Sequence, residues 1–133
     1  MENKAIFQSL IEMFPNLKHE LNEYEDEPIL MHLVFGDVIN PYIENCIYSH
    51  DFAEIRRIFQ FIDFILSEQD IYIQEVILFT VLERFADDDN KWNCIKPFLG
   101  PNTLKLLTIR GRATDFQNAH RPRRHGYNHG VFL

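Results

Sequence analysis

Apolar residues dominate one stretch of the chain, residues 70–85, with the sequence DIYIQEVILFTVLERF. At the rotation of about 100° per residue in an α-helix, its apolar side chains point to every side of the helix axis. Other elements would have to cover such a helix on all sides, because an exposed apolar surface of that size is sticky. A β-strand is the alternative, since Ile, Val, Tyr, Phe and Thr favour strands. Strands usually have about five or six residues, so we expect a buried central helix with Asp70 as its N-cap.

The stretch before it, residues 52–67, has apolar residues at intervals of three and four with polar residues opposite them. This pattern predicts an amphipathic helix. Phe64 departs from the pattern because it points to the polar side. Asp51 and Glu54 have the spacing of a capping box at the start of the helix. The short link at residues 68–69 predicts that this helix and the central helix form an antiparallel hairpin.

Shorter amphipathic stretches, separated by Pro, Gly and Asp, predict further helices on both sides of this hairpin. Residues 28–47 are apolar in a helical pattern but are interrupted by Gly36-Asp37 and by Asn40-Pro41. The two alternatives there are a helix kinked at Pro41 and two helices that meet at a corner. The predicted fold class is therefore all-α, a compact bundle of six or seven short helices packed as helical hairpins.

The composition changes after Ile109, where the helical pattern of apolar residues ends. Residues 110–133 contain five Arg, one Asp and many Gly, His and Asn residues without periodicity. We therefore expect a single helical domain in residues 1–109 and a basic, flexible C-terminal extension in residues 110–133. The five Arg residues leave two alternatives for the extension: non-specific contact with phosphates, or folding back onto the rest of the chain.

The formal net charge of −7 is unevenly distributed along these 133 residues. Residues 1–109 carry 8 Lys and Arg against 19 Asp and Glu, a net charge of −11, while residues 110–133 carry +4. An acidic domain of this kind repels nucleic acid and anionic membranes and attracts basic partners. We expect a protein partner and neither a nucleic acid nor a membrane.

The sequence contains no pattern typical of a catalytic, cofactor or metal site. Its serines lack the setting of a nucleophile, no glycine-rich phosphate loop is present, and His120, His125 and His129 have no cysteine near them. Cys46 and Cys94 lie in apolar segments without CxxC spacing, as reduced core cysteines do in cytosolic proteins. No signal peptide and no stretch of about 20 apolar residues is seen. We expect a cytoplasmic protein that is no enzyme and has no cofactor or metal.

Protein binding is the class that remains, and acidic side chains stand beside aromatic ones at three places in the chain. This combination steers a basic partner and anchors it with rings. The predicted partner-binding residues are Tyr24, Glu25, Asp26, Glu27, Asp37, Tyr42, Asp63 and Phe64. Each has a structural alternative: Asp37 caps a kinked helix, Tyr42 is half-buried, or Phe64 packs under the N-terminal helices.

Three segments carry a resemblance to a known family: LMHLVFGDVINPYI at 30–43, FQFIDFILSEQDIYIQEVILFTVLERF at 59–85, and PFLGPNTLKLL at 97–107. Together they resemble the small bacterial helical domains that are encoded beside polymorphic toxins and are regarded as immunity proteins. In that family a helix with a GD pair precedes an F-x-F helix with an acidic residue. A Q/N-E/N helix that ends in LE and a GP turn then follow. The resemblance covers most of residues 6–109.

The resemblance implies that the chain binds a co-encoded toxin in the producing cell and blocks its active site. Asp37 and Asp63 are then expected to contact the toxin, whereas Glu83 is expected to be structural. Many toxins are nucleases with basic clefts, which an acidic surface can occupy as a phosphate mimic. The alternative function is that of a helical adaptor or a homo-oligomer without catalytic activity.

Overall fold

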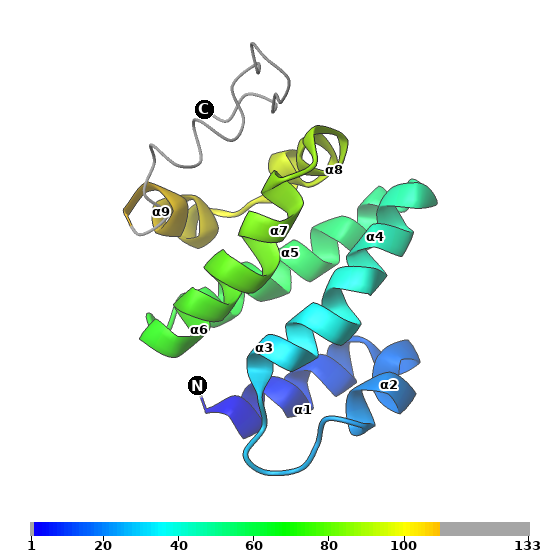
Figure 1. The fold of residues 1–133 in the computed structure, drawn as a ribbon, viewed down its shortest axis with the longest axis vertical. Helices are drawn as coiled ribbons and strands as arrows, with labels where there is room; N and C mark the ends of the chain where they lie inside the picture. The colour runs from blue at the N-terminus through cyan, green and yellow to red at the C-terminus, as the bar shows by residue number, and fades with distance from the viewer. Residues whose placement is uncertain (1, 110–133) are drawn as a thin grey trace.

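The structure, a computed structural model, describes residues 2–109 of the chain. These residues fold into helices that join into seven segments, and no strand occurs among them. The elements, in chain order (Figure 1), are α1 Asn3–Met13, the 3₁₀ turn η1 Pro15–Leu17, α2 Lys18–Asn22, α3 Met31–Val34, the π segment η2 Phe35–Ile39, α4 Asn40–Tyr48, α5 Phe52–Leu66, α6 Ile71–Glu75, the π segment η3 Val76–Leu82, α7 Glu83–Ala86, α8 Asp89–Ile95, the 3₁₀ turn η4 Lys96–Phe98 and α9 Pro101–Ile109. The predicted all-α class is confirmed. The predicted flexible extension, residues 110–133, lies outside the described residues.

The interrupted segment of the sequence is one continuous helix, formed by α3, η2 and α4 without a break. Proline in a helix interior has no amide hydrogen, and its ring crowds the carbonyl about one turn before it. Here the wider π turn of η2 lies directly before Asn40 and Pro41, which gives the proline ring room. The helix therefore continues through Pro41 instead of ending in a corner.

The predicted central helix is also present and consists of α6, η3 and α7. Asp70 is its N-cap, as predicted, because its carboxylate accepts a hydrogen bond of 3.1 Å from the Ile73 amide. The prediction that the helix is covered on every side is wrong. Ile71, Tyr72 and Phe79 have exposed fractions of 63%, 39% and 52%. The helix packs against α3, η2 and α5, and its opposite side is left open to solvent.

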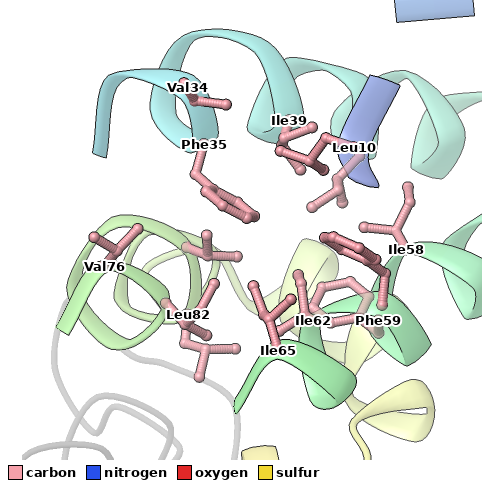
Figure 2. Close-up of a cluster of buried hydrophobic side chains, with 14 of the residues drawn as sticks. Leu10, Val34, Phe35, Ile39, Ile58, Phe59, Ile62, Ile65, Val76 and Leu82 are labelled. Atoms are coloured by element: carbon pink, nitrogen blue, oxygen red, sulfur yellow. The ribbon is translucent and has the colours of Figure 1, made fainter. Parts of the chain in front are cut away.

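The core lies where these two long helices meet α5. Figure 2 shows Phe35 from η2 and Phe59 from α5 turned toward each other between the helices, and both rings are buried. Val76 and Leu82 from η3 close this cluster from the third side. In Figure 1, α1 and α2 lie at one end of the molecule, and α8 and α9 at the other.

The two π segments pack directly against each other at the centre of the molecule. The Asn40 side chain is fully buried and donates a hydrogen bond of 2.9 Å from Nδ2 to the Thr80 carbonyl. A Cβ atom at Gly36 would lie 3.4 Å from Thr80 Cγ2, which places Gly36 directly opposite the Thr80 side chain. None of the helices in residues 2–109 is long and apolar enough to span a bilayer.

Candidate functional site

Two of the predicted residues, Tyr24 and Asp37, meet beside α2 and η2, and three more follow Tyr24 in the chain. The Tyr24 hydroxyl donates a hydrogen bond of 2.9 Å to Asp37 Oδ2, across 13 positions of the sequence. Glu25, Asp26 and Glu27 follow Tyr24 directly and are exposed. The hydrogen bond to the Asp37 carboxylate raises the pKa of the Tyr24 phenol, with burial as a second cause. We call these five residues the acidic face.

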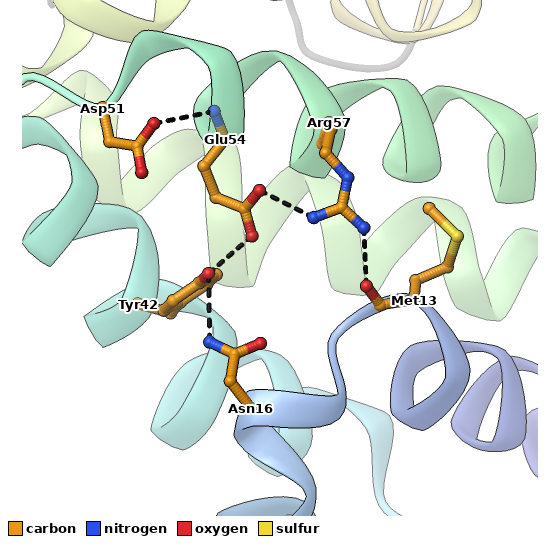
Figure 3. Close-up of polar contacts among 6 residues, drawn as sticks. All are labelled: Met13, Asn16, Tyr42, Asp51, Glu54 and Arg57. Atoms are coloured by element: carbon orange, nitrogen blue, oxygen red, sulfur yellow. Dashed lines mark hydrogen bonds and ion pairs between the residues drawn. The ribbon is translucent and has the colours of Figure 1, made fainter.

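Tyr42 belongs to a polar network that joins α4 to α5 (Figure 3). Its hydroxyl donates a hydrogen bond of 2.5 Å to Glu54 Oε2 and accepts one of 3.2 Å from Asn16 Nδ2. Burial, together with the hydrogen bond to the Glu54 carboxylate, raises the pKa of Tyr42 to about 12. Tyr42 is half-buried, which is the structural alternative to partner contact that the sequence left open for this residue.

The same network continues through Arg57 to α1. Arg57 Nη1 lies 2.7 Å from Glu54 Oε1, and Nη2 donates a hydrogen bond of 2.6 Å to the Met13 carbonyl. The guanidinium also covers the Phe14 ring, at 5.0 Å from its centroid. Arg57 thus ties the end of α1 to α5. No sequence pattern indicates this contact, because Met13 lies 44 positions away and contributes a backbone atom.

Phe64 lies on the outer side of α5 with an exposed fraction of 55%. It lines a groove of about 350 Å³ between α1 and α5. We call this hollow the α1–α5 groove, and its lining residues are Ser9, Glu12, Met13, Arg57, Gln60, Phe61 and Phe64. The predicted deviation of Phe64 toward the polar side is confirmed.

Asp63 points away from these surfaces and caps α9. Its Oδ1 accepts hydrogen bonds from the Thr103 amide at 2.8 Å and from the Thr103 hydroxyl at 3.0 Å. Its carbonyl accepts another bond of 3.1 Å from Asn102 Nδ2. A Cβ atom at Gly100 would lie 2.5 Å from Asp63 Cγ, so the glycine leaves the space for this carboxylate. Because the fold accounts for Asp63, we leave it out of the proposed contact surface.

The structure therefore brings together part of the predicted set. Tyr24 and Asp37 are in contact, the three acidic neighbours of Tyr24 are exposed, and Tyr42 lies further along the same continuous helix as Asp37. Phe64 and Asp63 are neighbours in sequence but lie at different places: Phe64 lines the α1–α5 groove, and Asp63 caps the start of α9. In residues 2–109 no group of three or more His, Cys, Asp or Glu side chains is arranged to hold a metal ion.

Comparison with known proteins identifies one family. Its model, described as a domain of unknown function (DUF7674), matches residues 7–112 of this chain. The matched range includes nearly all the described helices, the acidic face and most of the α1–α5 groove. No curated protein and no solved structure matches the chain.

Proposed function

We propose that this chain, which belongs to the DUF7674 family, is a protein-binding domain without catalytic activity that binds a basic protein through its acidic face. The observation that carries the proposal is the acidic face itself, where Asp37 accepts the Tyr24 hydrogen bond and three exposed carboxylates follow Tyr24 in the chain, on a domain with a net charge of −11. Such a surface raises the rate of encounter with a basic partner and disfavours acidic ones.

The proposed partner is a bacterial toxin encoded beside this chain, and the proposed role is that of a cytoplasmic immunity protein. The support is the resemblance of residues 30–43, 59–85 and 97–107 to immunity domains, together with the sign of the charge. If the toxin is a nuclease, its cleft is built for phosphates, and the acidic face would occlude that cleft as a phosphate mimic.

The hydrogen bond between Tyr24 and Asp37 also supports a binding role. It holds an aromatic ring and a carboxylate in one arrangement at 2.9 Å before any partner arrives. A contact group that is already ordered loses less conformational entropy when it binds. Glu25, Asp26 and Glu27 follow Tyr24 and supply negative charge. We expect these three charges to speed the encounter with a basic partner more than to hold the bound partner in place.

The experiment that tests the function is co-expression with neighbouring genes. Each small coding sequence next to this one in the source genome is expressed in a bacterial host, alone and together with this chain. We expect one neighbour to encode a basic protein that stops growth alone and does not stop growth in the presence of this chain. The proposal is overturned if no neighbour is toxic, or if the chain neutralises none of them.

Charge variants then test the surface. Replacing Glu25 and Glu27 by Gln should weaken binding of the neutralised protein about tenfold, because two steering charges are removed. Glu83→Gln with Asp87→Asn is the matched control, since both side chains are exposed in another part of the molecule. Binding is measured by calorimetry at fixed salt. If the two double variants lose the same amount of affinity, the effect comes from the overall charge and not from the acidic face.

An alternative function, a helical adaptor or homo-oligomer, is favoured by one observation. Phe64 and Phe79 are large apolar residues with about half of their surface exposed. Self-assembly of the chain would remove these two rings from water. Single exposed apolar residues are common on proteins, so the two rings do not by themselves require self-assembly. The association state of the chain separates this alternative from the proposed function.

A further inference from the structure

The α1–α5 groove is apolar along most of its wall and includes two charged residues in its lining. The charged residues that line it are Glu12 and Arg57. The Arg57 charge is matched by Glu54 at 2.7 Å, and its second nitrogen is bonded to the Met13 carbonyl. Glu12 forms no ion pair within residues 2–109 and is exposed. The groove therefore combines an apolar floor with one unmatched negative charge.

The groove is also held open before any ligand binds. Arg57 fixes the end of α1 to α5 through the Met13 carbonyl and covers the Phe14 ring at 5.0 Å. Tyr42 and Glu54 hold the other side of the guanidinium through the network of Figure 3. Two helices with a fixed separation form a surface into which a third helix packs its side chains. A pre-formed groove avoids the cost of ordering its walls.

Charge decides which kind of segment fits this groove. A second copy of the chain would bring another net charge of −7 against the first, which repulsion disfavours. An acidic or purely apolar helix would leave Glu12 without a partner. A helix with apolar residues on one face and Lys or Arg beside them fills the groove and pairs with Glu12.

We infer that the α1–α5 groove binds an amphipathic, basic helix of the partner protein, with an apolar side chain packed against Phe64 and a cation paired with Glu12. The inference rests on the proposed function in naming the toxin as the protein that carries this helix. It adds an anchor to the acidic face: the face steers the partner, and the groove holds it. Phe64 is then the residue that contributes most to the lifetime of the complex.

The test uses the full chain and two synthetic peptides as probes. One is an amphipathic helix of Leu and Lys of about 18 residues, and the other is the same design with Glu in place of Lys. Binding is followed by fluorescence anisotropy of the labelled peptide. We expect the Leu and Lys peptide to bind at least about tenfold more tightly than the Leu and Glu peptide, because the domain is acidic.

The protein variants locate the bound peptide. Phe64→Ala should weaken binding of the Leu and Lys peptide about tenfold, and Glu12→Gln about threefold. Phe79→Ala is the matched control, because Phe79 is exposed to 52% against 55% for Phe64 and lies on η3 instead of α5. It should change binding less than about twofold. Both Phe side chains are largely exposed, so we expect the variants to keep the fold, which circular dichroism checks.

The inference is overturned if Phe64→Ala and Phe79→Ala have equal effects, or if Phe64→Ala has none. Failure of the groove and failure of the proposed function are distinguishable. If Phe64→Ala leaves toxin and peptide binding intact while the Glu25 and Glu27 variant weakens toxin binding, the groove assignment is wrong and the function stands. If no neighbouring gene product is neutralised but the peptide binds in a Phe64-dependent way, the function is wrong and the groove remains.

Discussion

Among single residues, Asp63 departs most from what its neighbourhood in the sequence suggests. It lies on the amphipathic helix α5 next to the exposed Phe64, where a carboxylate usually faces solvent. Its carboxylate instead accepts both Thr103 bonds and caps α9, forty positions further along. Helices usually take their caps from the residue that precedes them, so no local pattern indicates a cap from position 63.

The arrangement of Asp63 and Gly100 gives a first prediction. Asp63→Ala should lower the free energy of unfolding by about 2 kcal/mol, because the start of α9 loses its cap. Gly100→Ala should lower it by about 1–3 kcal/mol, because the new Cβ would overlap the carboxylate at 2.5 Å. In the Asp63→Ala background the clash is absent, so Gly100→Ala should cost clearly less. Urea unfolding of the four proteins measures this, and simple additivity would contradict the arrangement.

A second residue-scale prediction concerns Tyr42. Its pKa is raised to about 12 in the folded protein, above the value near 10 of an unfolded tyrosine. A raised pKa means that folding favours the protonated phenol, so this contribution to stability is complete below pH 10 and is lost as the pH rises toward 12. Tyr42→Phe should remove this part of the alkaline loss of stability. Urea unfolding at both ends of that range tests it, with Tyr48→Phe at an exposed tyrosine as the control.

At the scale of elements, the two π segments set how the long helices meet. Both interruptions of the regular α-helix lie at the same contact, where Asn40 reaches the Thr80 carbonyl and Gly36 faces the Thr80 side chain. Asn40 Oδ1 has no hydrogen-bond partner within residues 2–109. A buried polar atom without a partner is costly, so the bond to Thr80 has to compensate for it.

Asn40→Asp tests this contact. At neutral pH the introduced carboxylate would face the Thr80 carbonyl in a dry site, which we expect to destabilise the domain by about 3 kcal/mol or more. Once protonated, the carboxyl group can donate to Thr80, so the loss should shrink as the pH falls below the raised pKa of the introduced group. Asn45→Asp, at an exposed site of α4, is the control. Equal pH dependence of unfolding for both variants would contradict the role of Asn40.

The central helix gives a further prediction at this scale. Ile77 is fully buried in η3, whereas Phe79 two positions later is 52% exposed. Ile77→Asp should abolish cooperative thermal unfolding, because an unpaired charge enters the core. Phe79→Asp should melt within a few degrees of the wild type. A cooperative, wild-type melt of the Ile77 variant by circular dichroism would refute the buried assignment.

For the whole molecule, net charge and exposed apolar residues have opposite effects on association between copies of the chain. The net charge of −7 favours a monomer through repulsion between copies, while Phe64 and Phe79 offer apolar contact. We predict a monomer of 15.9 kDa at low salt by analytical ultracentrifugation. Weak association should appear, if at all, on addition of salt, which screens the repulsion. A dimer that persists at low salt would favour the homo-oligomer over the proposed inhibitor.

The sequence by itself determined the helices, because their spacing of apolar residues and caps such as Asp51 and Asp70 act within a few positions. It also determined the acidic character of the domain, which depends on composition alone. It singled out Tyr24 and Asp37 as separate candidates for partner contact and did not predict the hydrogen bond that joins them across 13 positions.

Only the tertiary structure decided which sides of these helices are covered and which distant residues meet. The exposed side of the central helix, the Asp63 cap of α9, the tie from Arg57 to Met13 and the π contact of Asn40 with Thr80 all join positions far apart in the chain. Such contacts follow from packing the whole core at high density. A local pattern shows that a side chain is apolar or charged, but which neighbour covers it depends on how all helices pack together.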